Sequence, residues 1–188
     1  EVNVMKIGTF GTATTPVKRK VAVKDGVLDW KSAGLSLAVV FERYGKNGNI
    51  GYGLVEGALT KPGAVATTWS HDSHNLFVLG TDENDMKLAQ RRVLELQGAY
   101  VVFSEGRSLA EARLTIGGIV SDQPAEVLGQ ELKEVRAAME GLGYVNNNVI
   151  MSMSTLCLPV SPKLKLTDHG LLTVPGQEHV PLVEKYEG

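Results

Sequence analysis

The sequence predicts an α+β fold with mixed α/β layers, in which about two main helices pack on a mixed β-sheet. Three observations favour this fold. Short stretches rich in Val, Ile, Leu and aromatic residues alternate with turns over the first 80 residues. Two longer stretches carry apolar residues at helical spacing. The order of the elements, several strands and then helix, strands and helix, is typical of layered α+β domains.

The first strands are expected at residues 4–10, 17–23 and 35–44. Asp25-Gly26 follows the second of them, and this dipeptide favours a hairpin turn. The stretch LSLAVVF at 35–41 is almost continuously apolar. It is therefore expected to be a central strand that is buried on both faces.

The glycine-rich stretch GKNGNIGYG at 45–53 predicts a tight turn, since glycine and asparagine tolerate positive φ angles. It lacks the GxxxxGK[ST] spacing of a phosphate-binding loop, and no helix follows it. A tight connection between strands is the better interpretation. Further strands are expected at 50–59, 64–70 and 76–80.

A first helix is expected over residues 81–98, with Thr81 or Asp82 as N-cap and Gly98 at its end. Acidic residues fill its first turn, where they suit the positive end of the helix dipole. Residues 99–104 and 107–118 predict a hairpin around Glu105-Gly106.

A second helix is expected over residues 123–143, with Pro124 in its first turn and Ser121-Asp122 as its cap. One apolar face, suited to packing on the sheet, recurs along it at steps of four and three residues: Leu128, Leu132, Val135, Met139 and Leu142. Residues 159–188 hold four of the seven prolines and predict an extended arm that wraps the domain.

Composition limits the class of protein. The 188 residues, 43% of them hydrophobic, suffice for one domain with its own core, so we expect a single domain over residues 1–188. The net charge of -2 and the absence of any basic run argue against nucleic acid or an anionic membrane as partner. The sequence shows neither an apolar span nor a signal peptide, and Cys157 is the only cysteine. A cytoplasmic protein with one buried, inert thiol is expected.

The stretch SHDSHN at residues 70–75 is the clearest polar motif, because it holds two of the four histidines. It lies between two expected strands, where functional groups are often found. Three interpretations are open: a metal site built on His71, Asp72 and His74, a polar turn, or a loop that meets an active site supplied elsewhere. A metal site needs three or four ligands, and no further ligand is near in sequence, so we expect no metal on this chain.

The loop residues His71, Asp72, Ser73, His74 and Asn75 are therefore the main candidates for a functional site. We expect Asp72 to hold one of the histidines in a fixed tautomer. The secondary candidates are Asn47, Asn49 and Asp122.

Four motifs resemble the C-terminal domain of the bacterial and archaeal adenine deaminases, which belong to the metal-dependent amidohydrolase superfamily. They are GKNGNIGYGLVEGAL, ATTWSHDSHNLFVLGTDENDMKLA, IGGIVSDQPAE and LPVSPKLKLTDHGL. The resemblance covers about residues 36–182, in the same order and spacing.

The resemblance implies a catalytic (β/α)₈ barrel that holds the metal ligands. An HxH pair is absent from this chain, and 188 residues leave no room for a barrel of roughly 250 residues. The chain also begins with Glu1 rather than methionine, which favours its interpretation as the C-terminal piece of a larger enzyme.

The resemblance also implies an activity, which is hydrolysis of adenine to hypoxanthine and ammonia by the full-length enzyme. It implies Mn or Fe in the barrel, a small purine substrate and no cofactor on this chain. The partner would be the chain's own barrel or a separate catalytic subunit, and we expect a homo-oligomer. SHDSHN would face the active site. The alternatives are a non-catalytic binding or assembly module of the same fold, and a small hydrolase that binds metal through His71, Asp72 and His74.

Overall fold

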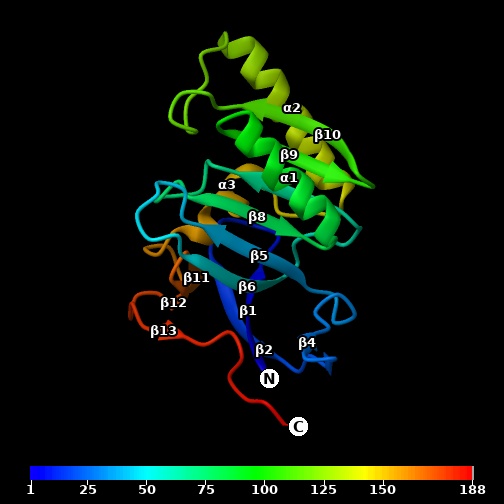
Figure 1. Cartoon of the computed structure of the whole chain (residues 1–188), viewed down its shortest axis with the longest axis vertical. Helices are drawn as coiled ribbons and strands as arrows, with labels where there is room; N and C mark the ends of the chain where they lie inside the picture. Colours follow the sequence, from blue (N-terminus) through cyan, green and yellow to red (C-terminus); the bar gives the residue numbers. More distant parts are fainter. Residues whose placement is uncertain (188) are drawn as a thin grey trace.

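The computed structural model describes residues 1–187 and confirms the α+β class. Its centre is an eight-stranded mixed sheet in the order β10-β9-β7-β8-β5-β6-β1-β2, which runs from top to bottom in Figure 1. Only β1 and β6 pair in parallel, and every other neighbouring pair in this sheet is antiparallel. The strands are β1 (Val2–Ile7), β2 (Thr14–Arg19), β5 (Ser36–Phe41), β6 (Ile50–Glu56), β7 (Ala64–Thr67), β8 (Leu76–Gly80), β9 (Ala99–Ser104) and β10 (Arg107–Arg113).

Helices cover both faces of the sheet. The helix α1 (Glu83–Glu95) packs on one face through Met86, Ala89 and Val93. The helix α2 (Ala125–Gly141) packs on the other through Val135 and Met139, beside the short helix α3 (Val149–Ser154) and the 3-10 turn η1 (Thr155–Cys157). Successive side chains of a strand point to opposite faces, so the central strand β5 contributes to the apolar core on each side of the sheet, as predicted for a strand buried on both faces.

Both predicted two-residue hairpin turns are confirmed. Asp25 and Gly26 join β3 (Val23–Lys24) to β4 (Val27–Leu28), and Glu105 and Gly106 join β9 to β10. All four turn residues have positive φ angles, as these tight turns require. The expected strand at 17–23 is wrong as a single element, because the chain leaves the sheet after Arg19 and Val23 belongs to the separate small hairpin.

The helix caps were predicted in part. Asp82 is the N-cap of α1, and its carboxylate accepts a hydrogen bond from the Asp85 backbone at 2.9 Å. The capping role of Ser121-Asp122 is wrong. The N-cap of α2 is Pro124, which has no hydrogen-bonding side chain, and Asp122 accepts from the Thr115 hydroxyl instead.

The C-terminal region is only partly an extended arm. Three short strands, β11 (Leu164–Thr167), β12 (Gly170–Thr173) and β13 (His179–Val180), form a second small sheet. Beyond it the chain runs extended beside β1, where the Asn3 backbone donates to the Leu182 carbonyl at 2.9 Å. The two ends of the chain therefore lie close together (Figure 1).

The glycines of IGYG have a packing role. A Cβ atom on Gly51 would lie 1.9 Å from the Thr167 carbonyl oxygen, and one on Gly53 would lie 3.2 Å from the Leu166 side chain. These two positions of β6 face the β11–β12 hairpin, which can approach the main sheet only because they lack side chains. No helix in residues 1–187 is long and apolar enough to cross a membrane.

Candidate functional site

SHDSHN forms the connection between β7 and β8 and is tied at its base. Ser70 and Asn75 are buried, at 0% and 3% exposure, and the Ser70 hydroxyl donates to the Asn75 carbonyl at 2.5 Å. The His74 backbone donates to the Ser70 carbonyl at 2.7 Å, and the His71 backbone donates to the Ser154 carbonyl at 3.1 Å. The loop is thus a closed turn with a fixed base, which holds its remaining side chains outside the core.

The two histidines of the loop are neighbours in space. Their ring centroids lie 5.4 Å apart, and the Trp69 ring meets His71 edge-on at 4.7 Å. The Nδ1 atoms of His71 and His74 are both buried and have no hydrogen-bond partner among the described residues. The hydrogen-bonding capacity of these two atoms is therefore not used by the rest of the described chain.

His74 is held in its neutral form. Burial lowers its pKa from the usual value of 6.5 and the neighbouring His71 lowers it further, while a hydrogen bond with the Thr68 backbone and the charge of Asp72 oppose the shift without reversing it. The backbone of His74 also has a positive φ of 51°, which is uncommon for a residue other than glycine. A neutral imidazole at neutral pH can either donate or accept a proton, as acid–base chemistry requires.

Asp72 and Ser73 are exposed at the tip of the turn. No hydrogen bond of the Asp72 carboxylate to either histidine is present in the described part of the chain. The expectation that Asp72 fixes a histidine tautomer therefore finds no support in the geometry. The carbonyl of Ser73 accepts from the Tyr44 hydroxyl at 2.9 Å, which links the tip to the neighbouring loop.

Arg43 holds three loops together at this end of the sheet. Its Nε donates to the His74 carbonyl, its Nη2 donates to the Gly117 carbonyl at 2.6 Å, and its guanidinium lies 4.6 Å from the Tyr44 ring centroid. The guanidinium forms no ion pair among residues 1–187. Its hydrogen-bonding capacity goes to backbone carbonyls, so Arg43 positions the loops.

A polar chain joins SHDSHN to the C-terminal strands. The Asn75 amide donates to the Asp168 carboxylate at 3.2 Å, and the other carboxylate oxygen of Asp168 lies 3.5 Å from Nε2 of His169. Nδ1 of His169 is 3.2 Å from the Asn49 amide. Sequence reasoning missed Asp168 and His169 as site residues, although they form part of LTDHGL. Their adjacency in that motif was the available signal.

Of the secondary candidates, only Asn49 reaches this cluster. The side chain of Asn47 accepts from the Asn49 backbone at 2.9 Å and stabilises the turn. No hydrogen bond joins Asp122 to SHDSHN in the described residues; its partner Thr115 belongs to its own loop.

The glycine-rich turn binds a carboxylate of its own. Glu42 accepts hydrogen bonds from four backbone N–H groups, those of Tyr44 and of three residues of this turn, Lys46, Asn47 and Gly48. Desolvation opposes ionisation of Glu42, but these four donors outweigh it and lower its pKa. The backbone donors that an anion would need are already used, which confirms a tight connection between strands.

A pocket of about 370 Å³ opens beside these residues. Its polar walls include Asp72, Asp168, His169 and His179. Cys157 also lines it and is buried, as expected, and burial raises the pKa of its thiol well above its usual range.

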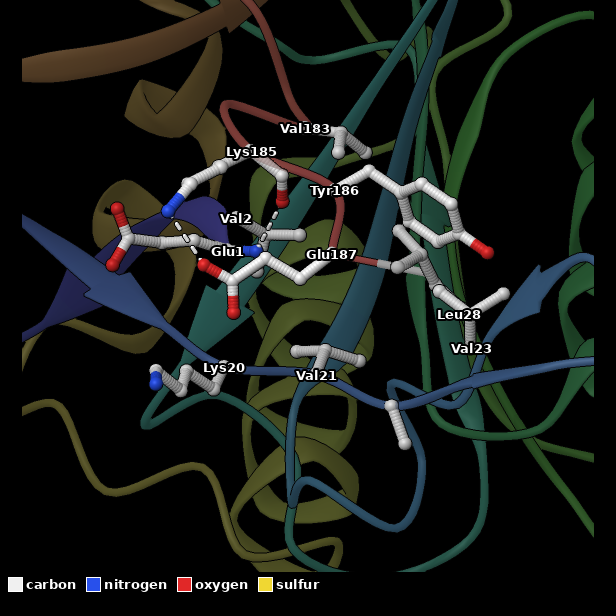
Figure 2. A pocket seen from close by; sticks show the side chains of 11 residues that line it. Glu1, Val2, Lys20, Val21, Val23, Leu28, Val183, Lys185, Tyr186 and Glu187 are labelled. Atoms are coloured by element: carbon white, nitrogen blue, oxygen red, sulfur yellow. Dashed lines mark hydrogen bonds and ion pairs between the residues drawn. The ribbon is translucent and has the colours of Figure 1, made fainter.

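A larger cavity, of about 620 Å³, lies elsewhere, where Glu1 and the residues 183–187 meet the β3–β4 hairpin. Figure 2 shows its lining, with the charged side chains of Glu1, Lys20, Lys185 and Glu187 on one side and the apolar Leu28 and Val23 with Tyr186 on the other. Lys185 pairs with Glu187 at 2.5 Å. This cavity contains none of the candidate residues.

The residues of SHDSHN and its neighbours do not fit a metal centre. Within residues 1–187 no three His, Cys, Asp or Glu side chains are placed to share one ion. His71, Asp72 and His74 are thus a weak basis for a metal-dependent hydrolase on this chain alone.

Comparison with known proteins gives one consistent result. Residues 11–178 match the family model described as the adenine deaminase C-terminal domain. The chain is 49% identical to adenine deaminase 2 of Oenococcus oeni over 181 residues, which cover 96% of the chain and 32% of that protein. It is 49% identical to an adenine deaminase of Clostridium perfringens (90% and 30% covered) and 44% identical to one of Lactobacillus delbrueckii (97% and 32%). The chain spans about a third of the length of these relatives.

Proposed function

Because the chain belongs to the adenine deaminase C-terminal domain family, we propose that it serves as the C-terminal domain of a hydrolase that deaminates adenine. In this proposal the domain helps to form or cover the active site, and the rest of a longer protein supplies the metal-binding barrel. The SHDSHN loop is the part of the domain that reaches the reaction site.

One observation carries the proposal, which is the convergence of four loops at one end of the sheet. Phe41 pairs with both Ile50 and Leu76, so the connections 42–49 and 68–75 leave the sheet at the same end. Arg43 ties the Gly117 loop to them, and Asn75 and Asn49 contact the 168–169 turn. We call this surface the loop edge. Each loop lies in one of the four motifs that resemble the family, although they are far apart in sequence.

The residues of the loop edge suit a purine deamination site. The reaction adds water at C6 of adenine and releases ammonia and hypoxanthine, so protons must move to and from ring and leaving nitrogens. A neutral His74 can exchange a proton at its Nε2 atom, and the Asp168–His169 pair offers a second imidazole with a carboxylate beside it. A metal ion, when bound by the barrel, would activate the attacking water.

The wider setting is part of the same proposal. We expect manganese or iron in the barrel, a cytoplasmic location that keeps Cys157 reduced, and a homo-oligomer. The alternative function is a non-catalytic assembly module, which would need the same fold but none of the loop chemistry.

The experiment compares three samples for ammonia release from adenine with manganese or ferrous iron present: the longer protein, its remainder without this domain, and this chain alone. We expect no turnover from this chain alone, and a kcat/KM of the remainder that is about 10²-fold or more below that of the longer protein, as is typical when positioned acid–base groups are lost. Full activity of the remainder would favour the assembly module. Turnover by the chain alone would contradict the proposal.

A further inference from the structure

Part of the main sheet next to the loop edge has no cover. On the face that carries α1, Val39 pairs with Tyr52 and Phe41 pairs with Ile50, so these side chains project from the same side. The helix α1 packs over β7, β8 and β9, and Trp30 and Leu35 cover the far end at Leu54. Between these covers Ile50 and Tyr52 are 45% and 51% exposed. We call this surface the β5–β6 face.

The β5–β6 face is continuous with an apolar groove. A hollow of about 220 Å³ runs between β5 and α1, with Leu37, Val39, Phe41, Val78 and Met86 on its walls. Glu83, Lys87 and Gln90 form its rim. An apolar, aromatic centre with a polar rim is the usual composition of a protein–protein contact.

Several other exposed apolar side chains are isolated: Leu94 lies on α1, Leu109 on β10 and Val127 on α2. Ile116 and Val120 do pair, but within one short loop, and Val23, Val183 and Tyr186 line the cavity at the chain ends; neither group lies on an open face of the main sheet. Single exposed apolar residues are normal in monomeric proteins, whereas neighbouring ones on an open sheet face mark a contact site.

The position of the face identifies the occupant. Ile50 directly follows Asn49, and Phe41 directly precedes Glu42 and Arg43, so the face begins where the loop edge ends. A body that covers the loop edge and places a substrate against SHDSHN would therefore also extend over β5 and β6. Relatives that contain this domain are about three times its length, so a body of sufficient size exists in the same polypeptide.

We propose that the β5–β6 face is the docking surface for the metal-binding part of the longer protein. This inference rests on the proposed function and adds to it the surface that sets the position of SHDSHN relative to the reaction site. Tyr52 and Ile50 are the central contacts, and the groove beside Met86 accepts an apolar side chain from the docked part.

Site-directed labelling tests the inference, because the native Cys157 is buried and gives little background. Tyr52→Cys and Ile50→Cys are treated with a maleimide in the isolated chain and in the longer protein, and the labelled peptide is followed by mass spectrometry. The control is Leu109→Cys, an exposed apolar position on β10. Thermal melting of each isolated variant verifies that it folds.

We expect the three variants to react at similar rates in the isolated chain. In the longer protein positions 50 and 52 should react at least roughly tenfold more slowly, because labelling then requires the contact to open, while position 109 is unchanged. Equal rates at all three positions in the longer protein would overturn the inference. It would also be overturned if protection already arose in the isolated chain as its concentration is raised, since a second copy would then be the occupant. The labelling rates need no turnover, so their failure is distinct from failure of the proposed function.

Discussion

At the residue scale, Arg43 links the fold to the candidate site. Its guanidinium donates to carbonyls of two loops, at His74 and Gly117, and stacks on a residue of its own loop, Tyr44. Lysine carries the same charge but lacks the planar fork, so it cannot make both contacts with one geometry. The arrangement of the loop edge should therefore depend on arginine at this position.

We predict that Arg43→Lys and Arg43→Gln each lower the free energy of unfolding by roughly 1–3 kcal/mol, since charge-assisted hydrogen bonds to the His74 and Gly117 carbonyls are lost. Arg91→Gln is the matched control, because Arg91 is exposed on α1, and it should change stability by less than about 0.5 kcal/mol. Urea unfolding of the isolated chain measures all three variants. Equal stability of Arg43→Gln and Arg91→Gln would show that Arg43 does not hold the loops.

His74 predicts a pH dependence of stability. Its folded-state pKa is lowered from 6.5, so below pH 6.5 the unfolded chain binds a proton that the folded chain resists. Stability is therefore lost as the pH falls from 6.5 towards the folded pKa and is unaffected by this group above that range. Between pH 7.5 and 5 the melting temperature of the native chain should fall more steeply than that of His74→Gln. Parallel curves would contradict a neutral, partly buried His74.

At the element scale, glycines on β6 and α2 have opposite effects on stability. Gly51 lies under the β11–β12 hairpin, where even one methyl group would meet a backbone oxygen. Gly129 lies inside α2 with open space around it. The first glycine is required for packing, whereas the second only weakens its helix.

We predict that Gly51→Ala lowers the free energy of unfolding by about 1–3 kcal/mol, as overpacking against an immobile group usually does. The matched Gly129→Ala should raise it by about 0.5–1 kcal/mol, because alanine favours helix. Calorimetry of both variants gives the two signs. A neutral Gly51→Ala would mean that β11–β12 does not pack on β6 as described.

The elements differ in how far sequence could predict them. The long strands and α1 carry clear apolar periodicity, and α1 also begins at the N-cap Asp82. These local signals are enough to predict the elements from sequence. The strands β11 and β12 have four residues each among prolines and glycines, and only their contact with β6 stabilises them. The helix α3, VIMSMS, has a β-branched start and two serines, which argue against a helix until burial outweighs them.

The site was predictable to the extent that its residues are adjacent in sequence. SHDSHN is visible as a polar stretch between strands. The contacts of Asn75 with Asp168 and of Asn49 with His169 join residues 93 and 120 positions apart, and no local pattern encodes such pairs. Asp122 is a candidate by its position before a helix, but its carboxylate accepts a hydrogen bond from the Thr115 hydroxyl in its own loop.

At the scale of the whole molecule, the faces of the sheet form the core, whereas one end of it carries the candidate site. Most of its two faces is covered by α1, α2 and the C-terminal strands, which make a core. Its loop edge gathers histidines, carboxylates and amides that lie outside this core, and the adjoining β5–β6 face is open. We propose that the rest of a longer protein lies against that end of the sheet.

Our central claim is that the loop edge forms part of an active site, and the most direct test measures kcat/KM and melting temperature together in the longer protein. The variants are His71→Ala and His74→Ala, with Lys133→Ala, at an exposed position on α2, as a control outside the loop edge. We predict that both histidine variants lose about 10²-fold in kcat/KM, as expected when a positioned proton donor or acceptor is removed. Each should lose less than about 1 kcal/mol of stability, as is usual for loop substitutions. Normal turnover with a lowered melting temperature in both histidine variants would contradict the claim and leave SHDSHN as a structural turn.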